Sequence, residues 1–559
     1  AAYLNGIQVA QENVAGHQPQ RSISLNSGPI DSAEVFTDFD LSAYIGLLRP
    51  GRNVLAVEGF NDSISDPVFL ILPVLTAGSD TMNPGRHYYF ASPTPGRPNT
   101  MGHPALAEPP DFSTVSGTFV DPFALTLSVQ SPDARIFYTV DGSEPGEGSR
   151  EYTGSIPVDH SLEIRARTFE PNRLPSPLVD HVFMAVAEDL RAFSSNLPIV
   201  LLDTSGHSIP GSASDRYAES RAVFMDTDSG GRAAVGGECN AAGRVGLRVR
   251  GRSSTQFPKK QYKLETWDDR NDDRDVSLFG LPAESDWVLY GPYSDKTLMR
   301  NYLAYLWWGA LGHYSVRTRF CEVFLNDDGD ANVSYADDYA GIYLLTEAIK
   351  IGSDRVDIMD SARTGNAEQE VKGGYIIEMG NANPGGFSSD VSGQTVHFSY
   401  WDPDAGQLTS AQKQYIRDCI QTFETRLYGA DFDDPPDGYA AYTDVHSQID
   451  YEIMREFTRN FDGGSTFFYI DEDGKLVMGP LWDYNMAMGN ANYAHNDEPG
   501  YSVTGWNDSY MAPGVNGWCP WWYRFRDDPD YQQRFIDRWF ALRQGILSDT
   551  NVLADILAA

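Results

Sequence analysis

Two aspartates near the end of the chain are spaced so that they could act together on a phosphate. Asp462 follows the helix-like run DYEIMREFTRN, Gly463-Gly464 interrupt that run, and Asp483 stands 21 residues after Asp462. Between them, STFFYI and KLVMGPLW have the composition of two strands, and DEDG joins them as a turn. Because the outer ends of a hairpin meet in space, one carboxylate could orient an acceptor hydroxyl while the other holds a divalent metal.

Basic residues that could hold phosphates lie upstream, in the segment PKKQYKLE. If KQYKLET is a strand, alternation places Lys263 on the face of Gln261 and Lys260 on the opposite face. Either lysine could pair with a phosphate, although a solvated basic strand edge would have the same sequence. Glu347 ends the apolar run YAGIYLLTE. It could hold the lysine in place or contact a nucleotide, and an exposed strand end is the alternative interpretation.

Two further polar groups lie beside these strands. Arg252, Ser253 and Ser254 form a short loop between two expected strands, and the backbone amides of such a loop could cradle phosphates. No GxGxxG sequence is present, so no standard kinase loop is expected. Arg300 and Asn301 fall within the helical run KTLMRNYLAYLWWGAL. Phosphate binding and a structural tie between helix and sheet are equally good interpretations of these two residues.

The composition is that of a folded, strongly acidic protein. Hydrophobic residues make up 41% of the 559 positions, and 78 acidic against 42 basic residues give a formal net charge of −36. Such a surface disfavours nucleic-acid binding, which needs basic groups to displace counterions. No apolar run is long enough for a membrane span, and AAYLNGIQVAQENVAG lacks the pattern of a signal peptide. The cysteines have no CxxC spacing and leave disulfide pairing open: Cys239, Cys321, Cys419 and Cys519.

Composition divides the chain into four segments. Residues 1–78 and 111–187 contain short β-branched runs bounded by Gly, Asn, Asp and Pro, which predicts strands. Residues 79–110 are dense in Pro and Gly and lack periodicity, as in a linker. Residues 197–559 mix strand-like runs with helical periodicity, as in SAQKQYIRDCIQTFETRLYG and YQQRFIDRWFALRQGI. We therefore expect a multidomain protein with N-terminal β-sandwiches followed by a large α+β domain.

The two β segments resemble known accessory domains. YLNGIQV and GRNVLAVEGF resemble the closing half of a galactose-binding-like jelly roll, whose opening strands we expect to precede this chain. FYTVDGSEP, with DG as its hairpin turn, and IRARTFE resemble the Ig-like domain at the C-terminus of chitobiases. Both kinds of domain usually act as spacers, although the first often binds carbohydrate. A Ca²⁺ ion in a β domain is a further expectation.

Five separated motifs occur in one order in the C-terminal region: LRVRGRSSTQFPKKQYKLE, DWVLYGPYSDKTLMRNYLA, YAGIYLLTEAIKIG, GGYIIEMG and GPLWDYNMAMGN. These strings and their order resemble the CotH family, atypical protein kinases first associated with spore coats and widespread in secreted bacterial proteins. The resemblance covers residues 197–559 and implies an α+β, kinase-like fold. It also implies ATP and Mg²⁺, or Mn²⁺ in its place, as cofactors.

The resemblance implies roles for individual residues. Asp462 takes the position of the catalytic base, and Asp483 takes that of the metal ligand. Asn485 would add an amide oxygen, which Mg²⁺ accepts as a ligand. Spore-coat members carry an asparagine soon after the base as a second metal ligand, whereas this chain has Ser465-Thr466 there. The Thr466 hydroxyl would then be the remaining, weaker ligand.

These expectations lead to one function and two alternatives. The first is ATP- and Mg²⁺-dependent phosphorylation of serine or threonine on an exported protein, with Lys263 holding phosphate beside the catalytic Asp462. The Ser465-Thr466 pair favours a second, a non-catalytic surface or matrix protein that keeps the fold to assemble with a partner. The third is a carbohydrate-associated protein localised by its β domains. In each case we expect a secreted or cell-surface location.

Overall fold

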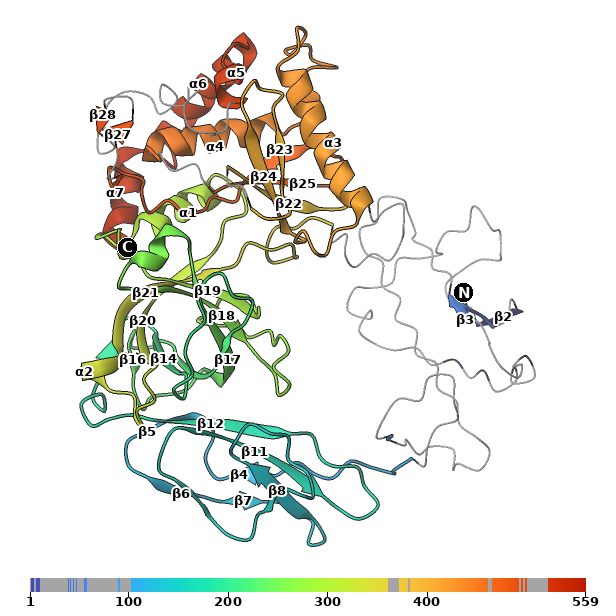
Figure 1. The fold of residues 1–559 in the computed structure, drawn as a ribbon, viewed down its shortest axis with the longest axis vertical. Helices are drawn as coiled ribbons and strands as arrows, with labels where there is room; N and C mark the ends of the chain where they lie inside the picture. The colour runs from blue at the N-terminus through green and yellow to red at the C-terminus, as the bar shows by residue number, and fades with distance from the viewer. Residues whose placement is uncertain are drawn as a thin grey trace. The chain divides into compact units, whose positions relative to one another are not determined.

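The fold is described from a computed structural model of the chain (Figure 1). The described residues are 2–4, 7–10, 39, 41, 44, 47, 55–57, 89–90, 102–359, 371–380, 383–460, 465–491, 494–495, 498–499 and 521–559. Contacts divide the chain into two compact units. The smaller comprises residues 1–108, 131–134 and 169–177, and the larger holds the remainder of the chain.

The smaller unit contains a three-stranded antiparallel sheet in the order β2-β1-β3. Its strands are β1 (Ala2–Leu4), β2 (Ile7–Ala10) and β3 (Leu55–Val57). These strands coincide with the YLNG and NVLAV runs that suggested a jelly roll. Most of the expected jelly roll at 1–78, and most of the linker at 79–110, lie outside the described residues.

An Ig-like β domain opens the larger unit, with a five-stranded sheet in the order β5-β12-β11-β8-β9. Two-stranded sheets β10-β6 and β4-β7 accompany it. The strands are β4 (Asp111–Phe112), β5 (Gly117–Phe119), β6 (Phe123–Leu125), β7 (Leu127–Ser128), β8 (Arg135–Thr139), β9 (Arg150–Glu151), β10 (Ile156–Val158), β11 (Leu162–Phe169) and β12 (Val179–Ala185). A hydrophobic core within this domain includes Leu125, Ile164 and Phe183. The expected turn lies at Gly142, whose φ of +78° favours glycine.

A closed barrel follows, in the order β14-β15-β17-β18-β19-β21-β20. Neighbouring strands are antiparallel except β14 and β20, which close the barrel in parallel. The strands are β14 (Ile199–Asp203), β15 (Ala218–Met225), β17 (Ala241–Arg250), β18 (Gln261–Thr266), β19 (Asp286–Tyr290), β20 (Thr318–Asn326) and β21 (Tyr339–Glu347). Alternation along β18 places Tyr262 and Leu264 in the barrel core. Lys263 therefore points outward.

The C-terminal part packs a second sheet against helices, in the order β23-β24-β22-β25-β26 (Figure 1). Its strands are β22 (Tyr375–Met379), β23 (Phe387–Ser389), β24 (Val396–Asp402), β25 (Thr466–Ile470) and β26 (Leu476–Met478). The helices are α1 (Arg300–Ala310), α3 (Ser410–Leu427), α4 (Val445–Thr458), α5 (Trp521–Phe525), α6 (Pro529–Gln544) and α7 (Asp549–Ala558). One large core joins this sheet and these helices to the outer faces of β19 and β21.

Short elements complete the described chain: β13 (Ser194–Ser195), β16 (Ala233–Ala234), α2 (Tyr335–Asp338), β27 (Ala494–His495), β28 (Glu498–Pro499), and two 3-10 turns at Ser253–Gln256 and Tyr439–Ala441. The fold confirms the expected order of β domains followed by a large α+β region. It corrects the start of α1, because Leu298 has a φ of +67° and cannot continue a helix from Lys296. The predicted hairpin between β25 and β26 is present.

Candidate functional site

Asp483 lies in a sharply turned segment beyond β26, at the end of the hairpin where β25 begins. Its φ is +62°, a conformation that aspartate tolerates better than most residues. The Asp483 backbone N–H donates to the Tyr305 hydroxyl at 3.2 Å. The neighbouring Trp482 ring stacks on Tyr305, with centroids 6.1 Å apart. Helix α1 therefore fixes the backbone that carries this carboxylate.

Arg250, the last residue of β17, is the basic side chain that faces Asp483. Its guanidinium lies over the Trp482 ring, 5.4 Å from the centroid, and its Nη1 donates to Gln261 Oε1 at 3.0 Å. Burial lowers the pKa of Arg250, and the negative charge of Asp483 opposes that effect. Burial also disfavours the charged form of Tyr290 and raises its pKa well above the ordinary value, and the negative charge of Asp483 raises that pKa further. Asp483 and Arg250, both half-buried, thus lie near the neutral phenols of Tyr290 and Tyr305.

Asn485 lies two residues beyond Asp483 in the same segment. Its Nδ2 donates to Ser294 Oγ at 3.2 Å, and its backbone carbonyl accepts from Asn490 Nδ2 at 2.7 Å. The first contact orients the side-chain amide, and Asn485 Oδ1 is buried without a hydrogen-bond partner among the described residues. An unpaired buried acceptor is unfavourable. A cation bound there would satisfy it, so the donor set fits Mg²⁺.

Arg300 borders this region at the start of α1 and is held by protein groups. Its guanidinium pairs with the fully buried Asp295 and donates to Thr297 Oγ1 at 3.0 Å. The Asp295 carboxylate also accepts from the Arg300 backbone N–H at 2.9 Å. Arg300 Nη2 reaches the Met488 carbonyl at 3.5 Å, in the loop that carries the site. These contacts favour a structural tie, and Asn301 beside it is buried.

Lys263 lies on the outer face of β18 and is paired with carboxylates. Its Nζ is 3.0 Å from Glu265 Oε1 and 3.0 Å from Asp286 Oδ1. Burial would lower the pKa of Lys263, but Asp286 and Tyr217 more than compensate and raise it. The lysine is therefore a firmly charged member of an ion-pair cluster. It is on the same face as Gln261, as alternation predicted.

Lys260 and the loop at Arg252 hold each other in place. Residues Ser253–Gln256 form a 3-10 turn directly after Arg252. Lys260 Nζ donates to the carbonyls of Thr255 and Phe257, at 2.7 Å each. The Lys260 ammonium is thus engaged with backbone oxygens, and these hydrogen bonds shape the loop.

Arg252 extends from this loop toward a buried glutamate that sequence reasoning missed. Arg252 Nη2 donates to Asn383 Oδ1 at 2.5 Å and lies 3.8 Å from Glu378 Oε2. Glu378 Oε1 accepts from Ser465 Oγ at 3.5 Å, and the neighbouring Thr466 is buried at the start of β25. The signal was an acidic residue inside the apolar strand YIIEM, because a buried carboxylate needs partners.

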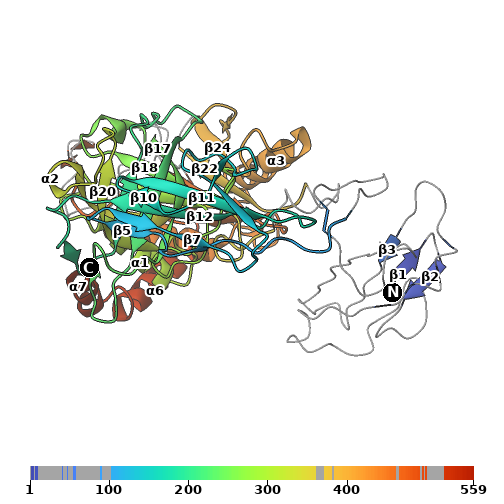
Figure 2. The ribbon, with the colours of Figure 1, turned by 90° about the horizontal axis from the view of Figure 1, so that it is seen from below.

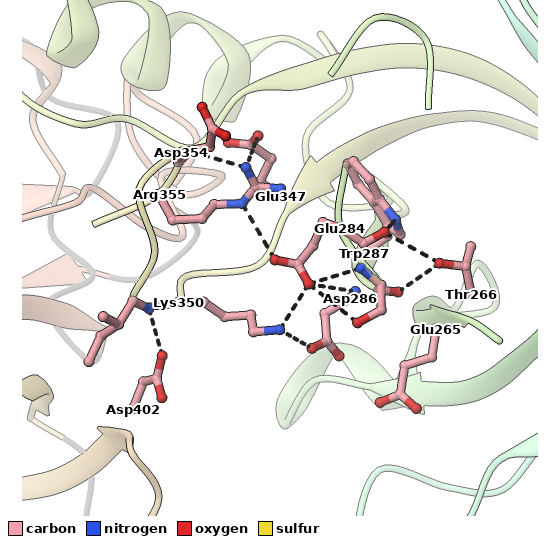
Figure 3. Close-up of polar contacts among 12 residues, drawn as sticks. Glu265, Thr266, Glu284, Asp286, Trp287, Glu347, Lys350, Asp354, Arg355 and Asp402 are labelled. Carbon is pink, nitrogen blue, oxygen red and sulfur yellow. Dashed lines mark hydrogen bonds and ion pairs between the residues drawn. The ribbon is translucent and has the colours of Figure 1, made fainter. Parts of the chain in front are cut away.

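Glu347 is completely buried rather than exposed at the end of its strand. Its Oε1 accepts from Arg317 Nε at 2.8 Å. The same oxygen lies 2.9 Å from Arg355 Nη1 (Figure 3). The Arg317 backbone N–H donates to Oε2 at 2.9 Å. The Glu347 carboxylate therefore pairs with two arginines, and not with a lysine as one interpretation of the sequence suggested.

The ion pairs continue through the segment after β21. Lys350 Nζ is 2.9 Å from Glu284 Oε1 and 2.7 Å from Asp286 Oδ2 (Figure 3). The adjacent Ile351 N–H donates to Asp402 Oδ2 at 2.6 Å, in β24. Because Asp286 also pairs with Lys263, one charge cluster joins the barrel to the C-terminal sheet.

The structure therefore groups the predicted residues in three places. Asp483 and Asn485 share one region with Arg250, which alternation along RVGLRVRG could have indicated. Lys263 and Glu347 belong to the charge cluster between barrel and sheet, and Arg252 and Thr466 lie near Glu378. Asp462 lies outside the described residues.

The sequence left disulfide pairing open and predicted no membrane span. Cys239, Cys321 and Cys419 are free thiols in the described chain, so none of these three is paired with another. Among the described helices, none has the length and apolarity needed to cross a membrane.

Comparison with known families settles the kinship of the C-terminal region. Residues 247–558, more than half of the chain, match the family model described as CotH kinase protein. The chain belongs to the CotH kinase family. The CotH match begins within β17, so it includes Arg250, Asp483 and Asn485. Residues 114–179 match the chitobiase/beta-hexosaminidase C-terminal domain, which confirms the second resemblance. A comparison with curated proteins found no match.

Proposed function

We propose that this CotH protein is an exported, ATP- and Mg²⁺-dependent phosphotransferase that modifies serine or threonine on another exported protein. The observation that carries the proposal is the arrangement of Asp483, Asn485 and Arg250. The Asp483 carboxylate and the Arg250 guanidinium interact, and Asn485, two residues after Asp483, has a buried amide oxygen without a partner among the described residues. Those are the groups that phosphoryl transfer requires around a metal-bound nucleotide.

Each residue has a proposed task. Asp483 and Asn485 would hold Mg²⁺, or Mn²⁺ in its place, which neutralises charge on the phosphates when bound. Arg250 would bind phosphate oxygens, since a guanidinium presents paired donors to them. Asp462 would orient the acceptor hydroxyl. Lys263 would act at longer range, because its ammonium is engaged by Glu265 and Asp286.

A second candidate function is a non-catalytic surface or matrix protein. Ser465-Thr466 stands where spore-coat members carry a metal-binding asparagine, and Thr466 is buried. The carboxylates that occupy Lys263 favour the same alternative. Such a protein would keep the fold to bind a partner, and its β domains would place it on carbohydrate.

Transfer of label from γ-³²P-ATP tests the proposal, with the purified chain and a mixture of secreted proteins as acceptors. Label incorporation should depend on Mg²⁺ and be lost in Asp462→Ala and Asp483→Asn. Asp473→Asn is the matched control, because Asp473 is an exposed aspartate in the turn of the same hairpin. Nucleotide binding without any transfer would support the non-catalytic alternative. Transfer that survives both aspartate variants would refute the assigned roles.

A further inference from the structure

We propose that His313, His446 and Asp450 form a Zn²⁺ site. Its ligands are distinct from the candidate phosphotransfer residues, which are Asp483, Asn485 and Arg250. His313 Nε2 lies 2.8 Å from Asp450 Oδ2, and His446 Nε2 lies 3.3 Å from the same oxygen. The three ligand atoms all lie within 4.8 Å of one another. Two imidazole nitrogens and one carboxylate oxygen thus converge on one point.

The chain builds this point from two separate elements. His446 and Asp450 are one turn apart on α4, so their side chains share a helix face. His313 arrives from the turn after α1, where Gly312 has a φ of +101°. The His313 ring stacks on the buried Trp308, with centroids 4.1 Å apart and planes at 14°. The imidazole is therefore held in place by packing.

The ligand chemistry selects the ion. Zn²⁺ bonds nitrogen and oxygen at about 2.0–2.1 Å in tetrahedral geometry, which sets ligand atoms about 3.3 Å apart. The separations from Asp450 Oδ2 are 2.8 and 3.3 Å and all three pairs lie within 4.8 Å, so side-chain shifts would bring the ligand atoms to that spacing. Mg²⁺ and Ca²⁺ prefer oxygen ligands, so two imidazoles disfavour both. Asp450 is buried while the His446 side chain is 53% exposed, so a fourth ligand could be water.

Arg538 of α6 supplies the outer support of this site. Its Nε is 2.7 Å from Asp450 Oδ1 and its Nη2 is 2.8 Å from Asp450 Oδ2. Hydrogen bonds of this kind orient ligating carboxylates in metal sites. The competing interpretation is a plain ion-pair cluster, in which the histidines and Arg538 only neutralise Asp450. The two interpretations differ in whether metal binds.

A Zn²⁺ ion here would tie together the turn after α1, helix α4 and, through Arg538, helix α6. The Tyr305 hydroxyl of α1 accepts from the Asp483 N–H, and the Trp308 ring of the same helix stacks on His313. The ion would therefore stabilise a helix that also contacts the candidate phosphotransfer residues. Ligands that bind only the folded chain raise its stability by mass action.

The experiment uses the full untagged chain after chelator treatment and dialysis. Zn²⁺ is titrated in competition with a chromophoric chelator, and Co²⁺ is added separately to record its visible spectrum. We expect one equivalent of Zn²⁺, an intense tetrahedral Co²⁺ spectrum, and a melting temperature that Zn²⁺ raises. His446→Ala should weaken Zn²⁺ binding at least about tenfold and abolish the thermal shift.

His160→Ala is the matched control, because His160 is an exposed histidine whose Nδ1 lies 2.6 Å from Asp159 Oδ1. It should bind Zn²⁺ as the wild type does. Since His446 is half-exposed, its variant should remain folded, which far-UV circular dichroism would confirm. Absence of a stoichiometric Zn²⁺ site in the wild type, or equal affinity in His446→Ala, would leave an ion-pair cluster only and overturn the proposal.

Discussion

The side-chain amide of Asn485 has a hydrogen bond at its nitrogen but none at its oxygen among the described residues. Nδ2 donates to Ser294 while Oδ1 is buried without a partner among the described residues. A buried acceptor without a partner is unfavourable, and a bound cation would satisfy it. Two residues earlier, Asp483 carries a negative charge that interacts with the guanidinium of Arg250.

The first prediction concerns Asn485. Asn485→Leu removes the oxygen and should weaken Mg²⁺-dependent nucleotide binding by about tenfold, near 1.4 kcal/mol. Asn485→Asp keeps an oxygen at the same place and should retain Mg²⁺ binding. Isothermal titration of both variants measures the difference. If the leucine variant binds as tightly as the wild type, Oδ1 is no metal ligand.

Sequence reasoning at this scale succeeded where residues are close along the chain. The hairpin carrying Asp483 was predictable from turn residues and strand composition. Arg250 and Glu378 were not singled out, because their importance depends on partners far away in sequence. Lys263 was placed on the correct face, but its pairing with Asp286 depends on the register of β18 and β19. Local patterns cannot supply that register.

At the scale of elements, Gly479 connects β26 to the segment that holds Asp483. It has a φ of +108°, and a Cβ there would lie 2.7 Å from Trp308 Cζ2. Alanine would therefore suffer both backbone strain and a collision with a buried ring. The glycine fixes how the chain leaves the hairpin.

We accordingly expect Gly479→Ala to lower the free energy of unfolding and to weaken nucleotide binding. Gly393→Ala is the control, because Gly393 has a φ of +80° and nothing within 4 Å of its added Cβ. That control should cost only the strain of the left-handed backbone, about 1–2 kcal/mol. Denaturant unfolding of both variants measures the contrast. Equal losses of unfolding free energy in the two variants would show that Trp308 moves aside at little cost, which would contradict the expected collision.

The charge cluster around Asp286 gives a pH dependence. Burial opposes ionisation of Asp286, but Lys263 and Lys350 more than compensate and hold its pKa below the ordinary 3.8. A carboxyl with a lowered pKa adds stability above its ordinary pKa, and that stability is lost as pH falls through the lowered value. The cluster should therefore weaken in acid, at pH below about 4.

Asp286→Asn tests this expectation. At neutral pH it should reduce the free energy of unfolding by about 1–3 kcal/mol, because two partly buried lysines lose a partner. The difference from the wild type should shrink as pH falls below about 4. Urea unfolding measured from pH 7 to pH 3 gives both numbers. A difference that stays constant with pH would contradict the assigned cause.

At the scale of the whole molecule, the Ig-like domain and the barrel share a hydrophobic core. Val182 and Met184 of β12 pack in one cluster with Leu201 of β14 and Val223 of β15. Strand β12 lies against β15 and β17, and Figure 2 shows it beside β5 and β11 of its own sheet. Arg244 of β17 also reaches Glu163 of β11, with 3.8 Å between Nε and Oε2. Composition suggested a domain boundary near residue 187, but the hydrophobic core contains side chains from both sides of that position.

This shared core predicts cooperative unfolding. Met184 is fully buried, so Met184→Ala should lower the free energy of unfolding by about 2–5 kcal/mol. Hydrogen exchange should show increased opening in both β11 and β14. Exchange that increases only within the Ig-like domain would mean that the two parts unfold independently.

The most direct test of the central claim is calorimetric titration of Mg-ATP into the purified chain. We expect binding to one site that requires the divalent ion. Asp483→Asn should weaken this binding by at least about tenfold, while Asp473→Asn should leave it unchanged. A wild-type chain that binds no Mg-ATP, or an Asp483→Asn variant that binds it equally well, would contradict the claim that Asp483, Asn485 and Arg250 form the nucleotide site.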